Sequence, residues 1–311
     1  MSVAVLICTY NRGNLVDQTL RSLIEEQDIQ PDEIVVVNGG GLHDCGETVD
    51  YWQVKFPALK HISTVNKNLA ASRNTGLSHC SATLVLQTDD DARPFPDWIK
   101  KMMAAHEMYA DAGVIGGQVV DASGNGLLDT VADALTFPWY PDTREVRSVP
   151  GVNASYKKSV IDQLGAYDTN LFRGEDVDYN WRAIQAGWKV RYVPGIKVYH
   201  HHRATWKGLL QQHYMYGKAY YLVRSKWTNM YAVYPRSLRS AKDLLKAGYF
   251  FISPVVNSFT RLKRIKGLSK KVVAFIPMTI VGYAWMTGLA VQYFHREKTI
   301  PPAQVEKLSA E

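Results

Sequence analysis

Short apolar runs that alternate with helical segments most constrain the fold of this chain. Four runs are each apolar enough to form a strand buried on both faces: residues 1–10, 33–37, 83–87 and 114–120. A helical pattern of apolar residues follows the first run from Leu15 to Ile24, and Pro31 ends it. Strands that alternate with helices predict an α/β protein with a mostly parallel, Rossmann-like sheet flanked by helices.

The composition excludes several other classes of protein. The 311 residues are 46% hydrophobic and 21% charged, which excludes a disordered or collagen-like chain. Only three cysteines are present, Cys8, Cys45 and Cys80, so a disulfide scaffold is excluded and a reducing compartment is indicated. The length allows one large or two small domains.

The formal charge of +7 is distributed unevenly. Residues 1–202 contain 18 basic and 25 acidic side chains, whereas residues 203–271 contain 15 basic side chains and one acid, Asp243. Residues 272–311 carry three charges of each sign. An acidic domain is therefore followed by a basic segment of the kind that anionic lipid headgroups attract. No nucleic-acid-binding motif accompanies the basic charge, so we expect no nucleic-acid partner.

Two uncharged runs lie in the C-terminal region. Residues 247–260 include Pro254, and residues 272–294 form a run of 23 that is long enough to cross a bilayer core of about 30 Å. A single span and a hairpin within one leaflet both fit these runs. For the preceding aromatic segment, up to about residue 235, the alternative is a helical subdomain that covers the sheet and has these aromatic side chains as its core.

The sequence thus predicts four regions. They are a catalytic domain at 1–202, a basic aromatic helical segment at 203–246, membrane-associated or transmembrane helices at 247–298 and a polar tail at 299–311.

Three consecutive aspartates, Asp89 to Asp91, follow the third apolar run. Carboxylates at the carboxyl end of a buried strand repel one another, and this is the edge at which open α/β sheets bind ligands. A divalent cation with oxygen ligands would relieve the repulsion and could bridge the phosphates of a nucleotide. A charged turn without a ligand is the alternative.

A second acidic cluster runs from Gly174 to Asp178. Acidic residues in the first turn of a helix favour the helix dipole, and Asp178 and Arg182 are spaced to pair on one helix face. A carboxylate at such a helix start could also act as general base.

Two further groups carry candidate polar side chains. His200, His201 and His202 are consecutive, and adjacent residues on a strand point to opposite faces, so they cannot all serve one site. Arg73 and Asn74 lie in a predicted short helix, where they could bind phosphate or ribose or simply solvate the helix.

Taken together and in this order, these motifs resemble the inverting family 2 glycosyltransferases of the GT-A fold. The resemblance extends over roughly residues 2–220, and these are the segments that carry it: Val5–Arg12, Glu33–Val37, Asn68–Gly76, Asp89–Pro94, Gly151–Ala154, Leu164–Asp168, Glu175–Asp178, Ala186–Gly187 and Pro194–His200.

The resemblance implies a donor site for a nucleotide-diphosphate sugar. Thr9 and Arg12 would line the nucleotide pocket, and Arg73 would approach it from the helix before the acidic strand. Asp89 and Asp91 would be the two ends of an Asp-x-Asp motif, with Asp90 between them in the donor site. Asp89 would bind ribose and share the metal site.

The resemblance also implies a metal, a base and a sugar subsite. Asp91 would hold Mg²⁺ or Mn²⁺ on the diphosphate, and His200 matches a histidine that some members use as a further metal ligand. Asp176 would be the general base, and Glu175 would orient the acceptor or the helix. A further stretch, Gly151 and Asn153, would lie beside the donor sugar.

One position departs from the family pattern. The family usually has aspartate after the second strand, where it accepts a hydrogen bond from a uracil- or thymine-like base, but this chain has Asn38. Asparagine can accept without charge and can also donate, so the choice of nucleobase stays open. The Gly39–His43 loop can reshape the same pocket.

The expected activity is transfer of a sugar, with inversion and with a metal, to an acceptor hydroxyl on a lipid-linked or membrane-proximal glycan. The expected location is the cytoplasmic face of the cell membrane. The alternatives are a polyprenyl-phosphate sugar synthase, a non-catalytic sugar-nucleotide-binding protein and a nucleotidyltransferase. The last would normally carry a glycine- and lysine-rich loop where Thr9–Arg12 stands. The oligomeric state is not predicted.

Overall fold

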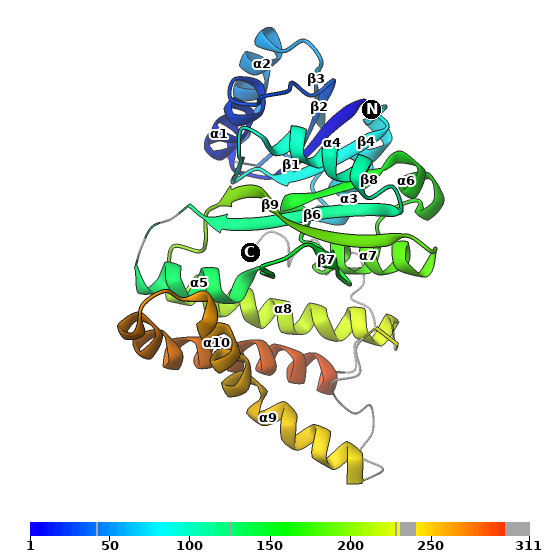
Figure 1. The fold of residues 1–311 in the computed structure, drawn as a ribbon. Coiled ribbons are helices and arrows are strands. Elements are labelled where there is room, and N and C mark those ends of the chain that lie inside the picture. The colour runs from blue at the N-terminus through cyan, green and yellow to red at the C-terminus, as the bar shows by residue number, and fades with distance from the viewer. Residues whose placement is uncertain (42, 123, 125, 228, 231–240, 296–311) are drawn as a thin grey trace. The chain divides into compact units, whose positions relative to one another are not determined.

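The computed structural model describes residues 1–41, 43–122, 124, 126–227, 229–230 and 241–295 (Figure 1). The predicted polar tail at 299–311 lies outside the described residues. The chain forms two compact units: one contains Met1–Ala122 and Pro138–His201, and the other contains Ser123–Phe137 and His202–Thr299. The second unit begins within one residue of the predicted boundary at 202, and it also includes a segment from inside the predicted catalytic domain.

The first unit is built on a sheet to which nine strands of the described chain contribute. Its strand order is β3-β2-β1-β4-β8-β6-β9-β5, and β7 pairs with β9. The strands have these bounds: β1 Val3–Thr9, β2 Glu33–Asn38, β3 Leu59–Ser63, β4 Leu84–Asp89, β5 Ala92–Pro94, β6 Ala112–Asp121, β7 Arg144–Glu145, β8 Ala154–Lys157 and β9 Lys189–His200.

The predicted parallel arrangement is confirmed for the N-terminal half of the sheet. Strands β3, β2, β1 and β4 pair in parallel, and β6 pairs in parallel with β9. The pairs β4–β8, β6–β8, β5–β9 and β7–β9 are antiparallel, so the complete sheet is mixed. β1 pairs with both β2 and β4, and its residues Ala4, Val5 and Ile7 are fully buried. A continuous apolar run is what a strand covered on both faces requires.

Helices flank this sheet, as Figure 1 shows. They are α1 Gly13–Ile24, α2 Gly46–Lys55, α3 Leu69–His79, α4 Trp98–Met108, η1 Gly151–Asn153, α6 Lys158–Leu164 and α7 Glu175–Gln185. Asn68 caps α3, because its side-chain oxygen accepts a hydrogen bond from the Ala71 backbone N–H at 2.9 Å. The predicted pair on α7 is also present, with Arg182 Nε 3.1 Å from Asp178 Oδ2.

The second unit is helical and consists of α5 Leu127–Thr136, α8 Trp206–Lys226, α9 Ala241–Arg261, η2 Leu262–Arg264 and α10 Leu268–His295. α8 and α10 approach so closely that a Cβ atom on Gly217 would lie 1.9 Å from the Trp285 backbone oxygen. A Cβ on Gly288 would likewise lie 1.9 Å from the Tyr214 oxygen. Both positions therefore need glycine, and small residues are the general means by which helix backbones come into contact.

Of the helices in the described chain, α10 alone is long and apolar enough to cross a membrane, judged by length and composition. Within its most apolar window, 28% of the residues are buried. Core helices of soluble proteins can meet the same criterion, so this property by itself is weak evidence for a membrane span.

A buried histidine predicts how the stability of the fold depends on pH. His106 on α4 is 2% exposed, its Nε2 lies 2.8 Å from Ser155 Oγ, and burial and the charge of Lys157 lower its pKa to about 3. The unfolded chain takes up this proton below about pH 6.5, whereas the folded chain does not. His106 should therefore contribute a fall of about 1.4 kcal/mol per pH unit in the free energy of unfolding below that point.

Urea unfolding at pH 7, 6 and 5 measures this dependence. His106→Gln should flatten the pH slope, and His79→Gln, which changes an exposed histidine, should leave the slope unchanged. A slope in His106→Gln as steep as in the parent protein would contradict the assignment.

Candidate active site

The candidate site lies where β1, β2 and β4 end. These parallel strands finish at Thr9, Asn38 and Asp89, and Thr9 pairs in register with Asn38. On the other side of β1, Cys8 pairs with Asp89. The sheet therefore brings three sequence-predicted residues to one edge, which is the edge at which open α/β sheets bind ligands.

One hydroxyl side chain and one guanidinium side chain bind the central aspartate of the triplet. Asp90 is 4% exposed, and its carboxylate accepts hydrogen bonds from Thr9 Oγ1 at 2.8 Å and from Arg12 Nη1 at 3.1 Å. Arg12 Nη1 also donates to Asp91 Oδ2 at 2.9 Å. Thr9, Arg12 and Asp90 thus bind one another and fix the turn that presents Asp89 and Asp91.

Asp89, Asp91 and His200 form a group that fits a metal ion. One potential ligand atom from each lies within 4.8 Å of those of the other two, and His200 Nε2 is 3.3 Å from Asp91 Oδ1. His200 reaches the group because β5, which follows the aspartates directly, pairs with the end of β9. Two carboxylates and an imidazole could hold a divalent cation.

Arg73 connects this group with the second acidic cluster. Its side chain is 5% exposed and extends from α3, where Nη1 donates to Glu175 Oε1 at 2.5 Å and Nη2 lies 3.7 Å from Asp89 Oδ1. A Cβ on Gly151 would lie 2.3 Å from Arg73 Nη2, so glycine is required for η1 to pass the guanidinium. Three predicted residues, Asp89, Gly151 and Glu175, therefore meet at the buried guanidinium of Arg73.

Asp176 lies beside this pair and is more accessible. Glu175 is 4% exposed, whereas Asp176 is half-buried in the first turn of α7. Its Oδ2 accepts a hydrogen bond from the Gly151 N–H at 3.0 Å, and its Oδ1 accepts one from the Val177 N–H at 2.7 Å. The carboxylate is thus held in place by two backbone N–H groups while it remains partly exposed.

Asn153 is placed differently from the other predicted residues. It is fully buried, and its Oδ1 accepts a hydrogen bond from Trp98 Nε1 at 2.9 Å. Its amide nitrogen donates to the carbonyl oxygens of Gln118 and Ile196 at 3.0 and 3.2 Å. These bonds use the polar atoms of the side chain, so Asn153 anchors η1, which carries Gly151.

The structure also places an acid that the sequence motifs did not identify. Asn38 Nδ2 donates to Asp44 at 3.0 and 3.2 Å, and Asn38 Oδ1 accepts from the Gly40 N–H at 2.8 Å. Asp44 Oδ1 also accepts from the Gly46 N–H at 2.7 Å, immediately before α2. The sequence signal that could have identified Asp44 is its position just before the start of α2. A carboxylate therefore lies next to Asn38, although position 38 itself is uncharged.

The electrostatics of the site favour a bound cation. Burial raises the pKa of Asp90 to about 6, although Arg12 opposes the shift, and burial likewise raises the pKa of Glu175 to about 6 against the effect of Arg73. Burial would lower the pKa of Arg73, but the charge of Glu175 reverses this, so the guanidinium stays protonated. The five carboxylates of the region and the guanidinium groups of Arg12 and Arg73 leave a formal charge of about −3, with these acids counted: Asp89, Asp90, Asp91, Glu175 and Asp176.

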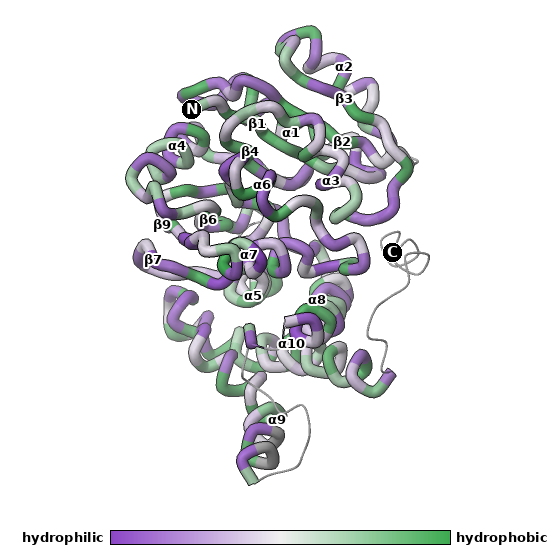
Figure 2. Tube along the Cα trace, turned by 90° about the vertical axis from the view of Figure 1, so that its right-hand side faces the viewer, coloured by the Kyte–Doolittle hydropathy of each residue, from purple (hydrophilic) through white to green (hydrophobic). Residues whose placement is uncertain are grey.

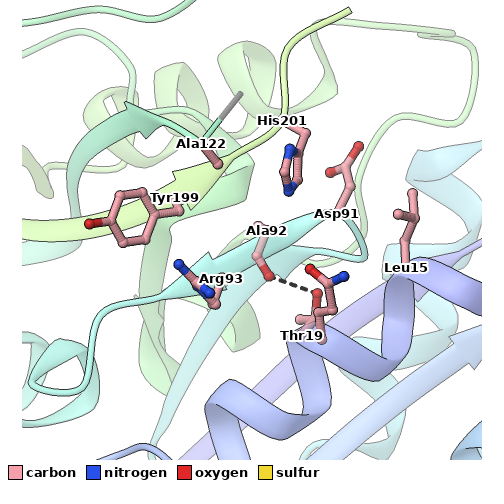
Figure 3. Close-up of a pocket in the computed structure, with 9 residues that line it drawn as sticks. Leu15, Thr19, Asp91, Ala92, Arg93, Ala122, Tyr199 and His201 are labelled. Atoms are coloured by element: carbon pink, nitrogen blue, oxygen red, sulfur yellow. Dashed lines mark hydrogen bonds between the residues drawn. The ribbon is translucent and has the colours of Figure 1, made fainter. Parts of the chain in front are cut away.

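A pocket of about 170 Å³ adjoins the acidic turn (Figure 3). It is lined by residues of α1, of β5 and of the end of β9, and Asp91 belongs both to this lining and to the candidate metal group. Figure 3 shows Asp91 and His201 near one another, with Arg93 and Tyr199 farther along the lining. Concave space is thus available next to a carboxylate of the metal group.

This arrangement agrees with comparisons to known proteins. The model of the glycosyl transferase family 2 matches residues 4–165, which is more than half of the chain. The chain belongs to glycosyl transferase family 2, and the family resemblance inferred from the motifs is confirmed.

Individual relatives are distant. The chain is 29% identical over 194 residues to a glucosyl-dolichyl phosphate glucuronosyltransferase of Haloferax volcanii, a match that covers 57% of this chain and 59% of that protein. It is 29% identical over 160 residues to a pre-mycofactocin glycosyltransferase of Mycobacterium tuberculosis, covering 49% of this chain and 34% of that protein. The chain therefore spans less than two thirds of the length of these curated relatives.

A solved structure confirms the GT-A fold. The mannosyltransferase of Pyrobaculum calidifontis, determined in complex with GDP-Man and Mn2+, superposes with a TM-score of 0.63. The match is 17% identical in sequence and covers 95% of this chain and 88% of that chain. At this identity the similarity concerns the fold alone.

The first prediction from the site concerns the buried ion pair. Arg73→Met would leave the Glu175 carboxylate buried without its partner, which should lower the free energy of unfolding by about 3–5 kcal/mol. Adding Glu175→Gln should recover part of this loss, because the orphaned charge is removed. Denaturant unfolding of both variants measures the effect.

An exposed ion pair is the matched control for this test. Lys158→Met breaks an exposed pair with Asp162 and should change stability by less than about 1 kcal/mol. If Arg73→Met and the double variant lost the same free energy of unfolding, the unpaired Glu175 charge would not be the cause of the loss.

The second prediction from the site concerns metal binding. Loss of a residue that only hydrogen-bonds to a metal ligand typically weakens metal binding by roughly 10–100-fold. Asp91→Asn removes a ligand itself, so it should weaken Mn²⁺ binding by more than this. Isothermal titration with Mn²⁺ alone measures this, and Asp97→Asn, at an aspartate paired with Lys101, is the control. Unchanged affinity in Asp91→Asn would exclude the aspartate as a ligand.

Proposed function

We propose that the protein is a metal-dependent, inverting glycosyltransferase that uses a nucleotide-diphosphate sugar. The observation that supports this most directly is the arrangement of two carboxylate groups with different surroundings. Asp89 and Asp91 lie with His200, whereas Asp176 is half-buried on a separate helix and held by the Gly151 N–H at 3.0 Å. The first set suits a cation on a diphosphate, and the second suits a base for an acceptor.

The donor would bind across the ends of β1, β2 and β4. Asp89, Asp91 and His200 would hold Mg²⁺ or Mn²⁺, which when bound neutralises charge on the diphosphate. Asp89 is one-third exposed and can also bind ribose. Asn38 is buried and its amide is bonded to Asp44 and Gly40, so it would position the exposed Asp44 carboxylate, which would accept a hydrogen bond from the nucleobase. Thr9 and Arg12 bind Asp90, and the three residues would support this pocket. Gly151 would border the donor sugar, and Asn153 anchors the segment that carries Gly151.

Asp176 would act as the general base. Its carboxylate takes the proton of the acceptor hydroxyl while the acceptor oxygen bonds to the anomeric carbon. The bond from that carbon to the diphosphate breaks, and the leaving group keeps the electron pair. The attack comes from the face opposite the leaving group, so the configuration inverts. The buried pair of Glu175 with Arg73 holds the first turn of α7, and so positions Asp176.

We further propose that the acceptor is a glycan that is lipid-linked or close to a membrane, at the cytoplasmic face. The supporting observations are the basic C-terminal region and the length and apolar composition of α10. The Haloferax volcanii relative is named for a dolichyl phosphate substrate, which agrees with this class of acceptor. A lipid phosphate acceptor, as in a polyprenyl-phosphate sugar synthase, is the second candidate on the same grounds.

A donor screen with a base variant tests the proposed reaction. Nucleotide release is measured with UDP-, dTDP- and GDP-sugars and Mn²⁺ or Mg²⁺, with and without lipid-linked acceptor. Asp176→Asn should keep donor binding within about twofold but lower turnover by about 10²–10⁴-fold, the usual contribution of a general base.

Asp162→Asn, which changes an exposed aspartate outside the site, is the control. Normal turnover in Asp176→Asn would remove this residue from the mechanism. Absence of nucleotide release from every donor would argue against the transferase itself and would leave the non-catalytic binding protein as the explanation.

A further inference from the structure

The long apolar helix α10 is packed along most of its length inside the helical unit. Its buried face, which includes Ala274, Met278 and Val281, joins residues of α5 and Leu209 of α8 in one apolar cluster. Farther along, Gly217 and Gly288 bring the α8 and α10 backbones into direct contact. These contacts fasten α10 to two neighbouring helices.

The helix to which α10 is fastened is polar. α8 carries exposed Lys207, Gln211 and Lys226, and Lys218 is half-exposed. If α10 crossed a bilayer while packed on α8, Lys218 and Gln211 would be drawn toward the hydrocarbon as well, where charged and polar groups are disfavoured. The contacts between α8 and α10 therefore disfavour a simple span.

The opposite face of α10 is apolar and exposed. Val272, Ile276 and Ile280 are spaced four apart on one stripe and are 66%, 67% and 52% exposed. α9 has a similar stripe in Phe251, Val255 and Phe259, with exposures of 61%, 38% and 70%. Figure 2 shows the hydrophobic residues along both helices. Apolar surface of this extent marks a site of contact with a partner or a membrane.

Lysines border this apolar surface at the turn between the two helices. Lys263, Lys266 and Lys270 are exposed there, and Lys271 follows at the start of α10. Arg261 and Arg264 are used differently, because they donate to backbone oxygens at the end of α5 and so hold the turn in place. The sequence from Leu244 to His295 contains no acidic residue. The surface therefore combines apolar side chains with positive charge.

We infer that α9 and α10 form a docking surface for an anionic lipid bilayer, in which α10 lies in the plane of the membrane and does not cross it. This inference rests on the membrane association proposed above and specifies its mode and its lipid class. The apolar stripes enter the boundary between headgroups and acyl chains, the lysines contact anionic headgroups, and α8 stays on the aqueous side.

Vesicle binding tests the lipid class. The full-length protein is sedimented with vesicles of phosphatidylcholine alone or mixed with phosphatidylglycerol. Replacing the four lysines by glutamine should weaken binding to the mixed vesicles by about tenfold or more, and high salt should do the same to the parent protein. Removing four exposed lysines of the first unit should have little effect: Lys55, Lys100, Lys101 and Lys189.

Polar substitutions test the apolar stripe. The triple variant Val272→Ser, Ile276→Ser, Ile280→Ser should lose vesicle binding, whereas three equally exposed apolar residues of the first unit serve as matched controls: Val54→Ser, Val65→Ser and Met108→Ser. Equal binding to neutral and anionic vesicles would overturn the lipid class. A concentration-dependent dimer in sedimentation that the triple variant abolishes would instead assign the stripe to a second copy of the chain.

Labelling of the two helix ends tests the orientation. Ser269→Cys and His295→Cys place a thiol at either end of α10, and a membrane-impermeant maleimide is added to vesicles carrying protein bound from outside. Both ends should react to the same extent, with the parent protein as background. Protection of one end until detergent is added would show a span and overturn the inference. Nucleotide release from soluble donor is measured in parallel. Failure of the proposed transferase activity would appear in this assay, whereas failure of the proposed docking surface would appear only in the vesicle experiments.

Discussion

The buried ion pair between Arg73 and Glu175 is the interaction on which the geometry of the site depends. These residues are 102 positions apart in the chain, and the pair joins α3, which packs on the parallel half of the sheet, to the first turn of α7. A charge buried this deeply is tolerated only with a partner in good geometry. The guanidinium thereby sets the position of Asp176, constrains η1 through Gly151 and limits the repulsion that Asp89 experiences.

The two units carry net charges of opposite sign: the first is acidic and the helical unit is basic. If the protein binds its donor as proposed, the acidic turn after β4 would repel the diphosphate unless a cation intervened, so affinity for the donor and affinity for the metal would be linked. The basic helical region would attract the proposed anionic surface, which the acidic unit would avoid. The net charge of +7 therefore describes neither unit.

Much of the fold could be predicted because it depends on local pattern. The apolar runs form β1, β2, β4 and β6, and the four-residue spacing of Asp178 and Arg182 was enough to predict their pair. The engagement of Asp90 with Thr9 could not be predicted, since it depends on which side chains meet across 81 residues. The packing of α5 in the helical unit could not be predicted either, because its amphipathic pattern would suit either unit. What assigns it is the set of hydrogen bonds from Arg261 and Arg264 to the end of α5, and these join residues more than 120 positions apart.

The glycine contact between α8 and α10 has a mechanical consequence. Where side chains separate two helices, rotamer changes let the helices slide or rock over each other at little cost. Here the two backbones touch at Gly217 and Gly288, so no side chain is available to rearrange, and the pair resists both sliding and compression. Rotamer changes at these two positions therefore cannot move α8 relative to α10, and the two helices are held as a pair by their backbones.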